Sequence, residues 1–91
     1  MLNGSFFNST DNGGDVYAGG NNYPLKGWKR SLWEGGIRGV GFVHGKQIEQ
    51  QARTNTELMH VSDWFPTLLH LAGGNMTSLK LDGYNMWPTI R

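Results

Sequence analysis

The sequence predicts an α/β fold, and three observations carry that prediction. After Ser62, apolar residues recur at helical spacing up to the helix-stopping pair Gly73-Gly74. Residues 37–43 combine β-branched and aromatic side chains with glycines, which indicates a strand that a neighbour approaches closely. Residues 13–36 contain seven glycines among polar and aromatic residues, which indicates a long loop. A sheet with one packed helix and a long glycine-rich loop is therefore expected.

The first predicted strand is short and lies close to the start of the chain. Residues 1–8 form an atypical start, in which Phe6 and Phe7 are expected to supply a stub of strand. This stub would aim Asp11 and Asn12, which follow it. The strand predicted over residues 37–43 is expected to be parallel to its neighbour and buried on both faces.

A third strand and the one clear helix are predicted further along. Residues 58–61 are expected to form a short strand. Ser62 or Asp63 can accept the unpaired N–H groups of the first helical turn, where Pro66 is tolerated. After the helix, residues 75–91 are expected to form a closing loop with a turn at Asp82. The helix is expected to face the sheet with an apolar stripe made of Phe65, Leu68, Leu69 and Ala72.

Composition excludes several classes of function. The 91 residues suffice for one small domain, but only 37% are hydrophobic, so a modest core is expected. The eight Lys and Arg residues are scattered and the formal charge is +1, which gives no footprint for nucleic acid. No apolar run approaches the ~20 residues that span a bilayer. Since cysteine is absent, these residues contain neither a disulfide nor a Cys-containing zinc site.

Asp11 and Asn12 stand side by side where the first predicted strand gives way to glycines. A carboxylate and an amide carbonyl are hard oxygen donors, which suit Ca²⁺ or Mg²⁺. The same two residues before Gly13-Gly14 are also typical of a plain turn, because short polar side chains bond to nearby backbone. The local sequence favours the turn and leaves the metal site open.

Other metal and phosphate motifs fail on spacing. An EF-hand loop that starts at Asp11 needs Gly at its sixth position and Glu at its twelfth, where Val16 and Asn22 stand. The glycines before Lys26 lack the spacing and the Gly-Lys-Ser/Thr ending of a P-loop. The histidines do not share zinc-type spacing, and we interpret all three as surface or packing residues: His44, His60 and His70.

Spaced blocks of the chain, taken in order, resemble the sulfatase family and most of all its arylsulfatase B-like branch. The blocks are STDNGGDVYAGGNNYPLKGWKRSLWEGGIRGVGFV (residues 9–43), VSDWFPTLLHLAGG (residues 61–74) and LDGYNMWP (residues 81–88). The resemblance implies a fragment of an alkaline-phosphatase-like sulfatase domain, of the α/β class with a mixed sheet. On this basis residues 1–91 form a partial domain from the carboxy-terminal side. Residues 9–43 would bind metal and sulfate, residues 58–74 would form a strand and helix, and residues 75–91 would close the domain.

The resemblance also implies roles for individual residues. Asp11 and Asn12 match the pair that coordinates the active-site Ca²⁺, and Lys29 matches the catalytic and substrate-binding lysine that contacts the sulfate group. Glu34 and Arg38 match a structural block, in which an ion pair would brace the loop that carries Lys29. The implied reaction is Ca²⁺-dependent hydrolysis of sulfate esters in sulfated sugars or aryl sulfates. Negative charge grows on the leaving oxygen, so cations that face it lower the barrier.

Besides its atypical start, the chain departs from the family pattern at the nucleophile. The family nucleophile derives from a Cys-x-Pro-x-Arg motif, which does not occur in these residues. We therefore expect that the chain alone does not hydrolyse sulfate esters, also because two oxygen donors fall short of the about 6 to 8 that Ca²⁺ takes. The alternative function is a non-catalytic remnant that serves as a carbohydrate-binding or structural module. Packing and sugar stacking both remain open for its loop aromatics, which are Tyr17, Tyr23, Trp28 and Trp33.

Three Asn-x-Ser/Thr sequons would accept N-linked glycans if the chain enters the secretory route. They lie at Asn3, Asn8 and Asn75. Asn75 is the expected glycosylation site because it follows the helix in a loop, whereas a glycan at Asn8 would crowd the strand end near Asp11. The family resemblance implies a lysosomal or secreted protein, and no targeting signal is expected within these residues.

Overall fold

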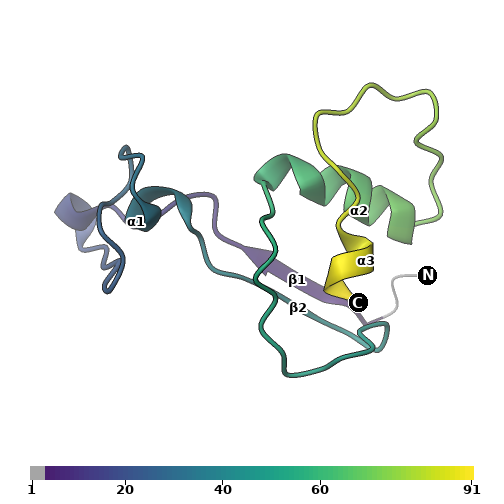
Figure 1. Ribbon diagram of the computed structural model, residues 1–91, viewed down its shortest axis with the longest axis horizontal. Helices are drawn as coiled ribbons and strands as arrows, with labels where there is room; N and C mark the ends of the chain where they lie inside the picture. The colour runs from purple at the N-terminus through teal and green to yellow at the C-terminus, as the bar shows by residue number, and fades with distance from the viewer. Residues whose placement is uncertain (1–3) are drawn as a thin grey trace. The chain divides into compact units, whose positions relative to one another are not determined.

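The computed structural model describes residues 4–91, so the sequon at Asn3 and the first part of the atypical start lie outside the described residues. By their backbone contacts residues 7–42 form one compact unit, and residues 4–6 with 43–91 form another. Both strands and helices are present, as the α/β prediction requires (Figure 1). The elements are, in order, β1 (Phe6–Ser9), η1 (Val16–Ala18), α1 (Glu34–Ile37), β2 (Gly41–His44), η2 (Val61–Asp63), α2 (Trp64–Leu71) and α3 (Trp87–Ile90).

Strands β1 and β2 pair into a two-stranded sheet. Ser5 lies beside Gly45, and Asn8 lies beside Gly41. Residue numbers therefore rise along one strand while they fall along its neighbour, so the sheet is antiparallel. The expected strand stub around Phe6 is confirmed by β1. Within residues 4–91 the sheet is thus a single antiparallel pair, and the mixed sheet is not seen there.

The prediction of a parallel, doubly buried strand over residues 37–43 is wrong. Strand β2 begins only at Gly41, and Phe42 within it is 52% exposed. Ile37 instead ends the short helix α1, because the Arg38 N–H bonds to the Glu34 carbonyl at 2.8 Å. The glycine pair inside α1 lets the chain coil tightly at a place where β-branched neighbours favour a strand.

The prediction of a strand over residues 58–61 is also wrong. Leu58 is 94% exposed, and Val61 opens the 3₁₀ turn η2. The His60 ring accepts the Ser62 N–H while the Asp63 carboxylate accepts the His60 N–H, so a reciprocal cap starts the turn there. Helix α2 follows at once, and its predicted glycine stop is confirmed, since Gly73 has φ +77°.

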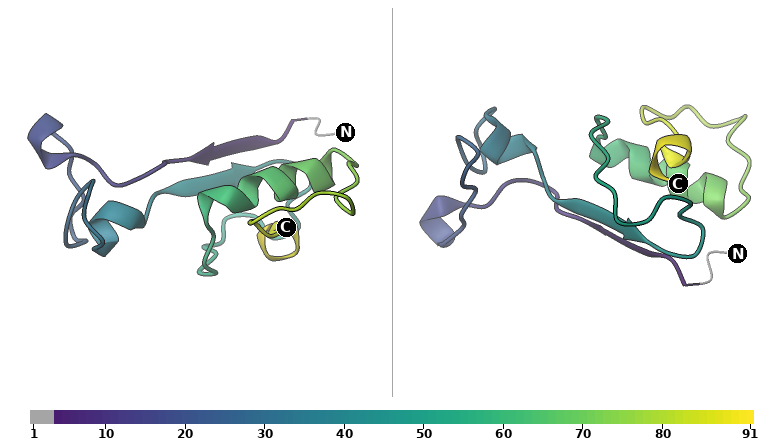
Figure 2. Two further views of the ribbon diagram at one scale, coloured as in Figure 1. Left: turned by 90° about the horizontal axis from the view of Figure 1, so that it is seen from above. Right: turned by 60° about the horizontal axis from the view of Figure 1, so that its bottom comes forward.

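The buried face of α2 is not the predicted apolar stripe. Phe65 is 57% exposed and Ala72 is exposed, whereas Leu68 and Leu69 are half-buried. The helix buries Pro66 and Thr67 instead and packs against α3, which lies in the expected closing loop (Figure 2).

Two polar side chains explain which face of α2 turns inward. The Thr67 hydroxyl donates to the Asp63 carbonyl (2.6 Å) and accepts the Met86 N–H (2.8 Å). Asp63 is buried as well, and its carboxylate accepts the Tyr84 N–H at 2.8 Å. Since buried polar groups require partners, these bonds tie α2 to the segment that leads into α3.

Candidate metal and anion site

Asp11 and Asn12 lie directly beyond the end of β1. Thr10 extends the ladder by one residue, because its N–H bonds to the Val40 carbonyl at 2.9 Å. The Asn12 Nδ2 donates to the Gly13 carbonyl at 2.9 Å, so the Oδ1 is the acceptor of this side chain that remains for a ligand. Asp11 is exposed. The pair therefore presents a carboxylate and an amide carbonyl at a strand end that the ladder holds in place.

Glycines bring the backbone of this pair against two other segments. The Gly13 N–H bonds to the Gly36 carbonyl in α1 at 2.9 Å. A Cβ atom on Gly13 would lie 1.7 Å from the Gly35 oxygen, so only glycine permits this approach. The Lys29 N–H bonds to the Gly14 carbonyl at 3.2 Å. The structure therefore places the Lys29 backbone next to the loop that begins with Asp11.

Most charged side chains within residues 7–42, all of which the structure describes, have an ionic or aromatic partner. The Arg30 and Asp15 side chains approach to 3.7 Å, and Arg38 and Glu34 to 3.6 Å. The Lys26 ammonium lies 3.8 Å from the centroid of the Trp33 ring. In this unit the two charged side chains without such a partner are Asp11 and Lys29.

Arg38 pairs with a carboxylate, as expected, and the structure identifies its partner as Glu34, one helical turn away. Both side chains are more than half exposed. An exposed pair of this kind adds little stability, so the loop that carries Lys29 depends on other contacts.

Sequence reasoning missed Asn22, which is the polar centre of the glycine-rich loop. Its side-chain oxygen accepts the Gly14 N–H, and its side-chain nitrogen donates to the Gly14 carbonyl and, at 3.3 Å, to the Gly27 carbonyl. The neighbouring Asn21 has the same chemistry but only caps a local turn at Tyr23. Because the two asparagines are identical in type and adjacent, the sequence carries no signal that separates them.

The loop aromatics have mixed environments. Tyr17 meets Trp28 edge to face, with 6.4 Å between the ring centroids. Tyr17 and Tyr23 nevertheless leave 84% and 88% of their surface exposed. The structure thus leaves most of the surface of both tyrosines exposed, although Tyr17 has a ring contact with Trp28.

The described part of the chain contains no cluster of metal-binding residues. Among residues 4–91 no three His, Cys, Asp or Glu side chains lie close enough together to hold a metal ion. Asp11 and Asn12 are the right kind of donor for a hard cation, but two donors leave most of its coordination to other groups. The pair can therefore form one side of a cation site.

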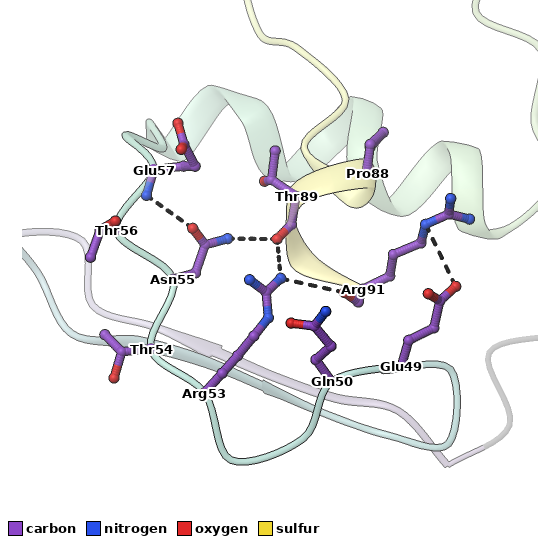
Figure 3. A pocket seen from close by; sticks show the side chains of 10 residues that line it. All are labelled: Glu49, Gln50, Arg53, Thr54, Asn55, Thr56, Glu57, Pro88, Thr89 and Arg91. Carbon is purple, nitrogen blue, oxygen red and sulfur yellow. Dashed lines mark hydrogen bonds and ion pairs between the residues drawn. The ribbon is translucent and has the colours of Figure 1, made fainter.

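A polar hollow lies in the other unit, beside α3 (Figure 3). Arg53 donates to the carbonyls of Thr89 and Arg91, and Asn55 donates to Thr89 at 2.8 Å. Glu49 meets the Arg91 side chain at 3.7 Å. The donors that line the hollow thus bond to the free carbonyls at the end of α3, as helix ends require.

Comparison with known proteins identifies the family of this chain. A family model for sulfatases matches residues 2–74. The chain is 51% identical over 83 residues to arylsulfatase J of Mus musculus, a match that covers 90% of this chain and 14% of that protein. It is 33% identical over 78 residues to steryl-sulfatase of Homo sapiens, covering 85% and 13%. It is also 33% identical over 86 residues to a sulfatase of Formosa agariphila, covering 90% and 15%.

The chain spans about one-seventh of the length of these relatives. None of the helices within residues 4–91 is long and apolar enough to cross a membrane. The family match extends over most of the chain and includes the strand end, the glycine-rich loop and α2. This chain belongs to the sulfatase family.

Proposed function

We propose that this chain supplies the cation- and sulfate-binding segment of a calcium-dependent sulfuric ester hydrolase. One observation carries the proposal. In the unit formed by residues 7–42, Asp11 and Lys29 are the charged side chains without an ionic or aromatic partner, and a backbone bond at Gly14 links their segments. An unpaired carboxylate and an unpaired ammonium, on segments that a backbone bond joins, fit a ligand that contains both a cation and an anion.

The chemistry of these residues suits sulfate esters of sugars or aryl groups. Asp11 and the Asn12 carbonyl would hold Ca²⁺, which supplies positive charge against the sulfate oxygens when it is bound. The Lys29 ammonium would bind a sulfate oxygen and stabilise the charge that develops as the ester S–O bond breaks. A preorganised contact of this kind is typically worth ~10²-fold or more in rate.

Titration of the full chain with CaCl₂ and inorganic sulfate, followed residue by residue by NMR, tests the proposal. We expect Ca²⁺ to shift the resonances of Asp11 and Asn12, and sulfate to shift those of Lys29 when Ca²⁺ is present. Asp11→Asn should abolish the response to Ca²⁺. Asp15→Asn is the matched control, since Asp15 is already paired with Arg30. Equal Ca²⁺ responses in the two variants would refute the assignment.

The sulfate contact has its own matched pair of variants. Lys29→Ala should remove the sulfate response and leave the Ca²⁺ response in place. Lys26→Ala removes the same charge from the same loop, but from an ammonium that lies over the Trp33 ring. If both variants weaken sulfate binding equally, general electrostatics accounts for the binding and Lys29 has no special role.

Turnover is a separate question from binding. The Cys-x-Pro-x-Arg motif expected for the nucleophile is absent from these residues. We therefore expect the isolated chain to bind cation and sulfate without hydrolysing an aryl sulfate. Metal-dependent release of the arylate by the purified chain would contradict this expectation.

A carbohydrate-binding module without catalysis is the second candidate. The uncovered faces of Tyr17 and Tyr23 favour it, because aromatic faces stack on the apolar faces of sugars. Binding of a sulfated oligosaccharide that persists with a chelator, and that Tyr23→Ala abolishes, would support this candidate. Loss of binding with the chelator would favour the cation-dependent site.

Asn75 is our proposed glycan acceptor, in a protein that follows the secretory route to the lysosome or the exterior. Asn75 is exposed, and its Oδ1 accepts hydrogen bonds from the Thr77 N–H (2.9 Å) and the Thr77 hydroxyl. Both bonds go to the Oδ1 and not to the Nδ2, which is the atom that carries an N-linked glycan. Asn8 instead lies within β1, where the sheet constrains it.

A further inference from the structure

The Asn22 side chain joins the two segments that carry the proposed site residues. Its Oδ1 accepts the Gly14 N–H at 2.7 Å. Its Nδ2 donates to the Gly14 carbonyl at 2.9 Å and to the Gly27 carbonyl at 3.3 Å. Gly14 closely follows Asp11 and Asn12, and Gly27 lies two residues before Lys29. A single amide therefore holds both segments.

We propose that Asn22 is a positioning residue that sets the placement of Lys29 relative to the Asp11-Asn12 pair. This inference rests on the proposed function, since it takes those three residues as the ligands of the cation and the anion. The Gly14 carbonyl accepts both the Asn22 Nδ2 and the Lys29 N–H, the latter at 3.2 Å. A displacement at Asn22 therefore reaches Lys29 through one oxygen atom.

The chemistry of the site calls for a primary amide. The three bonds need one acceptor and a nitrogen with two hydrogens, which Asn provides at this length. Asp at this position would lose the donor and direct a negative charge at two carbonyl oxygens. The Gly14 and Gly27 carbonyls would lose this donor and would be repelled by the carboxylate, and both effects weaken the contact between the segments.

Asn21 offers a matched control within the same loop. Its Oδ1 accepts the Tyr23 N–H at 3.0 Å, two residues along the chain. Asp keeps that acceptor, so Asn21→Asp preserves the local turn and adds the same charge one position away from Asn22. A difference between Asn21→Asp and Asn22→Asp therefore reports the bridge and not the charge.

Amide hydrogen exchange of the full chain, followed by NMR, tests whether the bridge exists. Asn22→Ala should speed exchange at Gly14 and Lys29 by roughly fivefold or more, the effect of losing one hydrogen bond. Asn22→Asp keeps the acceptor of the Gly14 N–H but loses the donor to the Gly14 carbonyl, so it should speed exchange at Lys29 by a similar factor. Asn21→Asp should change neither amide. The Ala72 amide, which bonds to the Leu68 carbonyl at 3.0 Å, checks that the chain stays folded. Unchanged exchange at Lys29 in both Asn22 variants overturns the proposal.

A second measurement separates positioning from general stability. Inorganic sulfate is titrated into the wild-type chain and Asn22→Ala, with and without CaCl₂. Asn22→Ala should reduce the Ca²⁺-dependent gain in sulfate affinity by roughly fivefold, as for one lost hydrogen bond, while the Ca²⁺ affinity itself stays unchanged. A variant that retains the full gain despite faster exchange at Lys29 overturns the positioning role.

The outcomes distinguish this inference from the proposed function. A wild-type chain that shows no Ca²⁺-dependent gain in sulfate affinity contradicts the proposed function. In that case the exchange rates at Gly14 and Lys29 still decide whether Asn22 holds the Lys29 segment in place.

Discussion

Gly13→Ala is the substitution that should disturb the site most for the smallest chemical change. The added Cβ would lie 1.7 Å from the Gly35 oxygen and 2.7 Å from the Gly35 carbonyl carbon, both of which are backbone atoms. The carbonyl has no rotamer to change, so α1 or the loop after β1 must move until the separation reaches at least 3.0 Å. This movement also breaks the bond from the Gly13 N–H to the Gly36 carbonyl.

Two terms set the magnitude of the Gly13→Ala effect. Overpacking of a closely packed site costs ~1–3 kcal/mol, and the lost hydrogen bond costs ~0.5–1.5 kcal/mol. We expect a local destabilisation of about 2 to 4 kcal/mol in the unit formed by residues 7–42. At the lower end this corresponds to an exchange rate roughly 30-fold faster for amides that open with that unit.

Native-state hydrogen exchange measures this local effect. The Gly35 amide, which bonds to the Lys26 carbonyl at 2.7 Å, reports on the unit that contains Gly13. Gly41→Ala is the control, because its Cβ would find the nearest atom at 3.5 Å, and Ala in a strand is favoured over Gly by ~0.5–1 kcal/mol. If Gly35 exchanges at the wild-type rate in Gly13→Ala, the close backbone approach does not exist in solution and the reasoning fails.

Three further changes probe the two units separately. Thr67→Val removes the acceptor of the buried Met86 N–H, and urea denaturation should show a loss of about 1 to 3 kcal/mol; an unchanged midpoint would contradict the buried bond. Arg38→Ala breaks an exposed pair with Glu34 and should change the unfolding free energy by less than about 0.5 kcal/mol in the same assay, so a larger loss would mean that the pair braces the loop. For a chain secreted from mammalian cells, Asn75→Gln should abolish the gel shift caused by an N-glycan-releasing enzyme, and a persisting shift would assign the glycan elsewhere.

The sequence predicted some of the ends and starts of helices and strands better than it predicted which side chains are buried. The stop of α2 at Gly73 and the strand stub at Phe6 follow from local backbone preferences, which do not depend on distant residues. The inward face of α2 does depend on them. Thr67 turns inward because Met86, 19 residues away, offers it a partner, and helical periodicity carries no information on that contact.

The prediction of a buried strand over residues 37–43 was wrong for a related reason. A run of Ile, Val and Phe with glycines fits a buried strand, but it fits equally a tight helical turn followed by an exposed ribbon. The contacts of Gly36 decide between them. A Cβ on Gly36 would lie 2.3 Å from the Ser31 carbonyl oxygen and 2.5 Å from that of Trp28, so the chain here folds back onto the loop before it.

At the candidate site the family resemblance supplied the proposed ligand groups, which are Asp11, Asn12 and Lys29, and they stay a prediction. The sequence carried no sign of the residues that join their segments. Asn22 and Gly13 act through backbone contacts that only the folded loop reveals. Proposed ligand groups can thus be read from spaced family motifs, whereas the contacts that set their spacing depend on the fold of the loop.

The glycines and Asn22 also determine where substitutions should matter most. The segments around Asp11 and Lys29 meet through backbone bonds at Gly14 and through one amide. The conspicuous aromatics Tyr17 and Tyr23 are largely exposed, and the contact of Tyr17 with Trp28 is edge to face. Removing a large tyrosine ring should therefore disturb the cation and sulfate contacts less than adding a single methyl group at Gly13, which is the opposite of what side-chain size suggests.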